Sequence, residues 1–560
     1  MILFLRFISH FSLLMISCFA FAALAAWRGI RDSVLLGLLG LVGIALPGYV
    51  AFFLWFLSRP LGHAFSFVLP LAEIAWLVWV WRRIEADAKA ALKQLLVPAG
   101  FVFSASLLVL SAGFLCGGIE KPLETPWTRF SHRLPPDNMI PFVFAEEVRS
   151  RWIVKPMLAD WHSSDRPPLQ SGIVLSQFPF LPQPRELGYM ALAVTLQSLW
   201  IYAMWLLLVA FGVSPRAIVL ILTVTLFSGF TFLNTFFVWP KLLAAALMIG
   251  FSTLVLVDRY YVRLREDVML MIVAGALLSL SMLAHGGTAF AFIGLIITGA
   301  LLHRRLPLKS AGVIFGTAAV IYLPWTLYQK LFDPPGDLLL KFHLAGVEHP
   351  NGIGLWETVL GAYRKLTLQQ YISGRWLNFV FVCDHMSDYW RSVWHLVSSA
   401  LTGRWDLAGS AAKDVRILTF FYFAPNMGFL VTGVLAVLAA IGKRYRTPDW
   451  RTAARLWVYV VSTLLPWCVI MFRPLSTSIH QGTYVAVLLA FAAAILTLWT
   501  ISPWLVFAIA ALEILLNLLA YGVFTTAGGQ LQFGQLVFLL LGLTFVGLQL
   551  RRIWRCSTVG

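Results

Sequence analysis

The polar side chains best suited to chemistry lie between two Pro-Pro pairs in an otherwise apolar chain. Asp137 directly follows the first pair, and Asp165 and Arg166 precede the second. A carboxylate can act as a general base toward a hydroxyl group, and the fork of a guanidinium matches phosphate oxygens. The same residues also suit simpler roles, because an isolated Asp often caps a helix and an adjacent Asp–Arg can form a loop ion pair.

Four further polar residues stand where apolar runs end. Lys241 follows a Trp-Pro pair, and His285 precedes two glycines. Arg473 and His480 flank a run rich in Ser and Thr. A lysine in an apolar run is costly unless it is paired or functional, although its ammonium can also snorkel to the interface. Ordinary turn and loop roles stay open for the other three residues.

One cluster has side chains of the kinds that metals bind. Asp384, His385 and Asp388 lie close together in the sequence, but no remote ligand matches them. The sequence therefore predicts no metal site, and it leaves a divalent metal open as a cofactor.

Composition determines what must position these residues. The 560-residue chain is 60% hydrophobic and 12% charged, with a mean hydropathy of +0.82. Soluble domains carry about 25% charged residues, so much of this surface must face lipid, and an all-α polytopic membrane protein is expected. The net charge of +17 resembles that of a nucleic-acid-binding protein. Its Lys and Arg cluster in short loops, however, as cytoplasmic retention predicts, so no nucleic-acid partner is expected.

Apolar runs of about 20 residues predict 13 to 15 transmembrane helices. The expected spans are residues 8–26, 33–57, 65–81, 95–116, 187–213, 217–237, 240–257, 267–284, 287–302, 309–327, 415–440, 454–472, 483–500, 503–523 and 533–550. One alternation places every basic cluster in the cytoplasm, namely residues 81–93, 258–267, 303–310, 442–455 and 551–555.

The same alternation leaves two long segments on the outer side, residues 117–186 and about 328–414, each expected to contain short interfacial helices. The chain then divides into N-terminal membrane helices (1–94), a membrane module with the first outer segment (95–327), the second outer segment (328–414) and C-terminal membrane helices (415–560). In the first outer segment, Asp137 or Asn138 is expected to cap a helix over 139–148.

Three short motifs follow one another in this segment: Asp137-Asn138, Ala159-Asp160-Trp161 and Arg166-Pro167-Pro168-Leu169. Their order resembles the integral-membrane glycosyltransferases of the GT-C class, in particular protein O-mannosyltransferases and lipid A aminoarabinose transferases. More distantly, it is similar to membrane arabinofuranosyltransferases. In that pattern an acidic pair opens the helix and a Lys precedes Pro-Pro-Leu. Here Asn138 replaces the second acid, Arg166 replaces the Lys, and three spans precede the module.

The resemblance implies transfer of a sugar from a polyprenyl-phosphate donor to a periplasmic glycan, lipid or protein, at the outer face of a bacterial inner membrane. It implies Asp137 as the catalytic general base and Arg166 as the first candidate for the donor phosphate. The other residues expected to bind donor or substrate are Asp165, Lys241, His285, Arg473 and His480.

Two other classes of membrane protein remain as alternatives. A lipid-linked glycan ligase or polymerase would depend on Arg473 and His480 rather than on Asp137. A transporter or flippase of lipid-linked sugars would favour internal repeats and charges paired at mid-membrane, and the sequence has few such charges.

Overall fold

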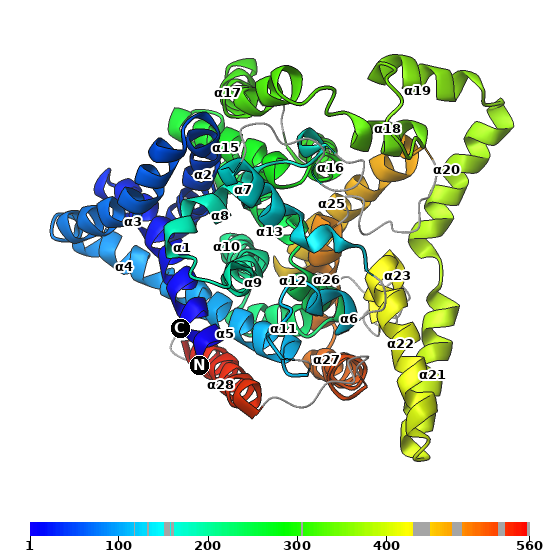
Figure 1. The fold of residues 1–560 in the computed structure, drawn as a ribbon. Helices are drawn as coiled ribbons and strands as arrows, with labels where there is room; N and C mark the ends of the chain where they lie inside the picture. Colours follow the sequence, from blue (N-terminus) through cyan, green and yellow to red (C-terminus); the bar gives the residue numbers. More distant parts are fainter. Residues whose placement is uncertain are drawn as a thin grey trace.

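A computed structural model gives the fold, and the residues it describes form helices and connecting turns without β-strands. The described residues are 1–116, 118–130, 134–150, 157, 162–303, 306–428, 448–472, 484–524 and 533–556. Figure 1 shows the helices gathered around α9 and α10, with the helices of the second outer segment along one side. The expectation of an all-α polytopic membrane protein is confirmed.

The membrane helices fall into three stretches of the chain. The first contains α1 (Ile2–Trp27), α2 (Ser33–Leu57), α3 (Arg59–Trp81), α4 (Ala86–Gln94) and α5 (Leu96–Gly113). The second contains α9 (Arg185–Gln197), α10 (Leu199–Ala210), α11 (Pro215–Leu226), α12 (Gly229–Phe237), α13 (Lys241–Leu256), α14 (Asp258–Leu264), α15 (Val268–Ala284), α16 (Thr288–Leu302) and α17 (Leu308–Leu331). The third contains α25 (Pro448–Ile470), α26 (Tyr484–Trp499), α27 (Pro503–Leu518), the π-helical turn η5 (Leu519–Val523) and α28 (Phe533–Cys556).

Among the described residues, nine helices are long and apolar enough to cross a membrane, or up to eleven if each of two bent pairs is one span. Three shorter apolar helices, α15, α16 and α26, accompany them. Every expected span except 415–440 coincides with one of these elements. That span was wrong at its start, because residues 415–421 belong to a helix that begins at Trp405 and carries Asp406, Lys413 and Asp414. Its later part, 429–440, lies outside the described residues.

The two outer segments fold into short helices, as expected. The first contains α6 (Thr125–Thr128), the 3₁₀ turn η1 (Pro136–Met139), α7 (Ile140–Ser150), the turn η2 (Ser163–Asp165), α8 (Leu169–Ser176) and the turn η3 (Phe178–Phe180). The second contains α18 (Leu338–Ala345), α19 (Leu355–Arg364), α20 (Leu368–Cys383) and α21 (Met386–Leu401). It also contains the start of α22 (Trp405–Phe421), which runs past the expected boundary at residue 414 and is followed by α23 (Phe423–Asn426).

The basic loops meet at one end of the bundle. The carboxylate of Asp258 lies 2.8 Å from the guanidinium of Arg455 and 3.6 Å from Nδ1 of His303, and Ser310 donates a hydrogen bond to the carbonyl of Arg265 at 2.9 Å. Loops from three parts of the chain therefore share one end, as the alternation of spans predicts.

Helix α8 packs closely against α2 because two glycines face each other. A Cβ atom on Gly172 would lie 2.2 Å from the carbonyl oxygen of Gly48, and one on Gly48 would lie 2.3 Å from Ile173. Any larger residue at either glycine would push the helices apart. The Pro-Pro pair at 167 and 168 starts α8 at this contact, which fixes the position of the preceding Arg166.

A buried carboxylate holds the turn before Arg166. Asp333, just after α17, lies 2.8 Å from Nδ1 of His162 and accepts hydrogen bonds from the Ser163 hydroxyl at 2.5 Å and the Ser164 N–H at 3.2 Å. Burial alone would raise the pKa of Asp333. The hydrogen bonds and the charge of His162 outweigh burial, so its pKa lies below the ordinary value of 3.8.

Asp333→Asn should lower the unfolding temperature, because the amide has one acceptor oxygen in place of two and carries no charge. A hydrogen bond to a charged group contributes about 1.5–3 kcal/mol. The additional stability of the wild type over the variant should be full above pH 3.8. It should be lost as the pH falls through the lowered pKa of Asp333. Thermal unfolding of protein in nanodiscs measures this, with the exposed Asp87→Asn as control. Equal unfolding temperatures for both variants at neutral pH would contradict this role for Asp333.

Candidate functional site

Asp137 and Arg166 lie together although 28 residues separate them in the sequence. A guanidinium nitrogen of Arg166 is 3.8 Å from a carboxylate oxygen of Asp137, and both side chains are partly buried. Asp137 lies in η1, the turn that leads into α7, and Arg166 lies between η2 and α8. The fold therefore brings the sequence-predicted acid and its nearest predicted cation into one place.

Lys241 reaches the same place from the break between α12 and α13. The chain turns there through Val238, which has a φ of 55°, a strained conformation for a β-branched residue. The buried ammonium of Lys241 lies 3.8 Å from the ring centroid of Trp239 and 5.5 Å from that of Tyr484. It is also within electrostatic reach of Asp137 and Arg166. Lys241 is thus held inside the protein beside the Asp–Arg pair.

Two histidines complete the group. Burial lowers the pKa of His285 well below its ordinary value, and the charges of Lys241, Arg166 and His343 lower it further. Burial and the charges of Lys241 and Arg166 lower the pKa of His343 to about 4. Both imidazoles are therefore neutral at neutral pH. Nδ1 of His285 accepts a hydrogen bond from the Gly287 N–H at 3.0 Å, which leaves its proton on Nε2 as a donor.

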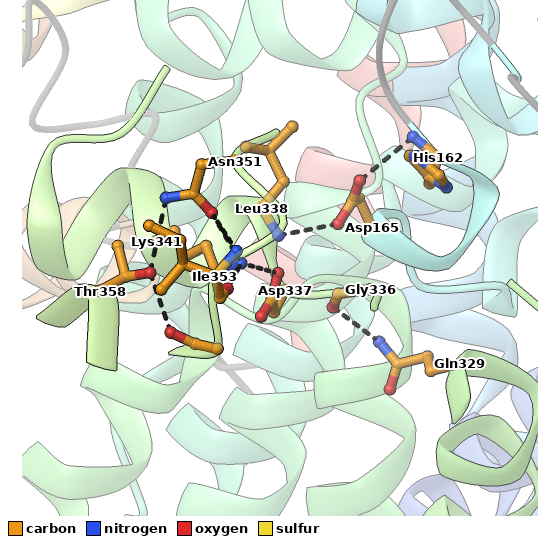
Figure 2. A network of polar contacts seen from close by, with 11 residues as sticks. His162, Asp165, Gln329, Gly336, Asp337, Leu338, Lys341, Asn351, Ile353 and Thr358 are labelled. Atoms are coloured by element: carbon orange, nitrogen blue, oxygen red, sulfur yellow. Dashed lines mark hydrogen bonds and ion pairs between the residues drawn. The ribbon is translucent and has the colours of Figure 1, made fainter. Parts of the chain in front are cut away.

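Nothing in the sequence indicates that His343 belongs to the site, because no motif surrounds this lone histidine of α18. Its position follows from Asp165, whose carboxylate accepts hydrogen bonds from the backbone N–H groups of His162 at 3.1 Å and Leu338 at 3.0 Å. Figure 2 shows this carboxylate between the turn at His162 and the start of α18. These contacts give Asp165 a positioning role, and its binding of substrate stays a prediction.

Lys341 holds the loop after α18 in place. Its buried ammonium lies 2.9 Å from the carboxylate of Asp337 and donates hydrogen bonds to the Asn351 side chain at 3.2 Å and the Ile353 carbonyl at 2.5 Å (Figure 2). Because three oxygen atoms surround this ammonium, it stabilises the loop.

Asn138 has a scaffolding role. Its side chain accepts a hydrogen bond from the indole of Trp127 and donates one to the carbonyl of Leu123 at 2.9 Å. Its carbonyl accepts a hydrogen bond from the buried Tyr189 hydroxyl at 2.7 Å. An amide can both donate and accept here, which a carboxylate cannot do. This explains in physical terms why the position beside Asp137 suits an Asn rather than a second acid.

A row of buried amides continues from Tyr189 to the Lys241 turn. Gln170 donates to the Tyr189 hydroxyl at 3.2 Å and to the carbonyl of Val238 at 3.1 Å. Gln197 donates to Gln170 at 2.9 Å and accepts from the N–H of Leu243 at 3.2 Å. The chain of bonds thus satisfies backbone groups at the end of α12 and the start of α13 that the helices leave unpaired.

The remaining predicted positions divide into two groups. Arg473, His480 and the motif 159–161 lie outside the described residues. The N–H of Phe472, which precedes Arg473 in the sequence, donates a hydrogen bond to the carbonyl of His343 at 2.9 Å. His385 interacts with Asp384 and Asp388, but the described part of the chain contains no group of three or more His, Cys, Asp or Glu placed to hold a metal ion.

Comparisons with protein-family models, with curated proteins and with solved structures give no match for this chain.

His343→Gln should reduce the acid sensitivity of the fold. The pKa of His343 is about 4 in the folded protein against an ordinary 6.5, so between these values the unfolded chain binds the additional proton. Wild-type stability is therefore retained above pH 6.5 and lost as the pH falls toward 4. In thermal unfolding we expect the variant to lose less stability over this range, by a few degrees. The exposed His395→Gln is the control, and identical pH profiles for both variants would refute the burial of His343.

Proposed function

We propose that this chain is an integral-membrane glycosyltransferase that moves a sugar from a polyprenyl-phosphate donor to an acceptor hydroxyl. The observation that carries the proposal is the convergence of one carboxylate with several nitrogen donors. The guanidinium of Arg166 lies 3.8 Å from Asp137, and Lys241, His285 and His343 are within electrostatic reach.

The charge of the group suits a phosphate. Arg166 is a cation, and an anion bound beside Lys241 would keep its amine protonated. The neutral His285 retains an N–H donor, and Asp137 adds a carboxylate to the group. Two cations close together in a medium of low polarity repel each other strongly. An anion that binds between them relieves this repulsion, which favours the phosphate of a lipid-linked donor over a neutral ligand.

In the proposed reaction the acid acts on the acceptor hydroxyl and the cations act on the donor phosphate. Asp137 accepts the proton of the acceptor hydroxyl while the acceptor oxygen forms a bond to the anomeric carbon. The bond between that carbon and the phosphate oxygen breaks, and its electron pair leaves with the polyprenyl phosphate. Negative charge thus accumulates on the phosphate as the bond breaks, where Arg166 and Lys241 stabilise it more than in the ground state.

The location of the group fits a lipid-linked donor. Lys241 and His285 stand at helix ends that connect membrane helices, so a phosphate bound there leaves its polyprenyl chain beside apolar spans. The basic loops around Asp258, His303 and Arg455 lie at the ends of α13 and α15 that are away from Lys241 and His285. We therefore propose that the site faces the periplasm of a bacterial inner membrane, where the acceptor is a glycan, a lipid or a protein.

Asp137→Asn should reduce sugar transfer about 10²- to 10⁴-fold, the usual contribution of general-base catalysis. Purified protein in nanodiscs with a radiolabelled polyprenyl-phosphate sugar gives the measurement, with Glu124→Gln, an exposed acid in the same outer segment, as control. Transfer that survives Asp137→Asn would exclude the proposed mechanism. Transfer lost in Arg473→Ala and kept in Asp137→Asn would favour a glycan ligase.

Phosphate binding provides a second, independent readout. Arg166→Ala should weaken the binding of a short-chain polyprenyl phosphate about 10- to 100-fold, as expected when a charge-assisted hydrogen bond worth about 1.5–3 kcal/mol is lost. Asp137→Asn should strengthen it, because a negative charge near the phosphate is removed. Arg166→Lys, which keeps the charge, should bind with intermediate affinity. If Asp137→Asn weakened phosphate binding, Asp137 would have a structural role instead.

A further inference from the structure

The second outer segment continues beyond the site as an arm formed by α19, α20, α21 and α22. In Figure 1 α10, α16 and α17 are seen close to end-on, whereas α20 and α21 are seen from the side, along the edge of the bundle. The arm therefore runs across the direction of these helices. Its orientation is that of helices lying along a membrane surface.

Polar contacts fix the arm at the ends of two membrane helices. Arg375 of α20 donates hydrogen bonds to the carbonyls of Val469 at 2.6 Å and Phe472 at 2.7 Å. Asn378, one turn later, donates to the carbonyls of Cys468 at 2.9 Å and Met471 at 2.7 Å. These carbonyls belong to the last turn of α25 and the residues after it, which the helix itself leaves unpaired.

Arg416 of α22 makes the corresponding contact with another membrane helix. Its guanidinium donates to the carbonyls of Ala520 and Phe524, at the end of the span formed by α27 and η5. The alternation of spans places the ends of α25 and α27 on the same side of the membrane. A membrane span ends at the membrane surface. The contacts of Arg375 and Arg416 with the ends of two spans therefore hold the arm at the membrane surface.

The outward face of α20 is apolar. Leu368, Ile372, Trp376 and Phe379 are exposed by 75%, 57%, 62% and 48%, and their spacing of three or four residues places them on one side of the helix. Arg375 lies at the edge of this side, and the buried Asn378 lies farther round the helix, toward α25. A helix that packs on a protein and faces water buries its apolar side chains and exposes its polar ones. In α20 these apolar side chains are exposed instead.

Exposed apolar side chains also occur on α25 and on the other helices of the arm. Val461, Leu465 and Val469 of α25 form a stripe that is about half exposed, and this stripe ends at the carbonyl that Arg375 binds. Exposed tryptophans lie along the rest of the arm, namely Trp356, Trp394 and Trp405. Tryptophan is enriched at the boundary between hydrocarbon and headgroups, so the arrangement is that of a surface that passes from the acyl chains to the interface.

We propose that this outward face, formed by Leu368, Ile372, Trp376 and Phe379 with the three tryptophans, is a membrane-docking surface. Its occupant is the boundary between the headgroups and acyl chains of the leaflet on the side where the Asp137 group lies. The end of α25 connects that group to the arm, since Phe472 contacts both His343 and Arg375. The proposal depends only on exposure, spacing and the helix ends, and it holds whatever reaction the site performs.

Fluorescence quenching tests the depth of this face. Ile372→Cys is introduced into a variant whose native cysteines are replaced, labelled with bimane, and reconstituted into vesicles of phosphatidylcholine and phosphatidylglycerol. Lipids with a nitroxide near the headgroup should quench the label severalfold more than aqueous iodide does. Val461→Cys in α25 is the control for lipid contact, and Lys121→Cys, whose native side chain is 73% exposed in the first outer segment, is the control for water.

The outcomes separate the possible occupants. Quenching by the headgroup nitroxide that exceeds quenching by iodide at residue 372 supports the membrane surface, with residue 461 showing the weak iodide quenching expected in lipid. A profile like that of residue 121 would overturn the proposal, because the face would then be in water. Protection from both quenchers would also overturn it, because a protein surface such as a second copy of the chain would then cover the face. A cysteine in place of an exposed isoleucine leaves the contacts of Arg375 and Asn378 unchanged, so the variant should fold.

Discussion

The candidate site depends on a chain of buried hydrogen bonds that runs from Asn138 through Tyr189 and Gln170 to Gln197. Each member is almost completely buried, so a partner lost here leaves a polar group without water to replace it, which costs about 1–3 kcal/mol. The chain connects the turn of Asp137, the helix after Arg166 and the break before Lys241. Asp137, Arg166 and Lys241 thus owe their relative positions to these four buried residues.

The outer segments are connected to this scaffold by carboxylates that bind backbone N–H groups. Asp333 holds the turn at 162–164 and Asp165 holds the start of α18. In these contacts a charged carboxylate accepts hydrogen bonds from backbone N–H groups that turns and helix starts leave unpaired. The segments that they connect are far apart in the sequence. They leave Asp137 as the acid that faces the cations. Asp165 thus binds backbone N–H groups, whereas Asp137 faces the guanidinium of Arg166.

Side chains also bind unpaired backbone groups at the C-terminal ends of membrane helices, where the groups without partners are carbonyls rather than N–H groups. Arg375, Asn378 and Arg416 bind such carbonyls at the ends of α25 and α27. These three side chains are therefore directed inward, whereas apolar side chains of α20 such as Ile372 and Trp376 are exposed. The second outer segment contributes one side chain, His343, to the group around Asp137, and it also carries a separate apolar surface.

Composition and the lengths of apolar runs determined that the chain is helical and crosses a membrane repeatedly, because transfer into lipid depends on local sequence. The Pro-Pro pairs likewise predicted the turns that carry Asp137 and Arg166, since proline fixes its own φ and restricts the residue before it. Only the tertiary structure decided that Asp165 and Asn138 position other groups and that His343 joins Arg166 and Lys241. The reason is that hydrogen bonds and charge–charge contacts between segments many residues apart depend on how the helices pack, and no local pattern records that packing.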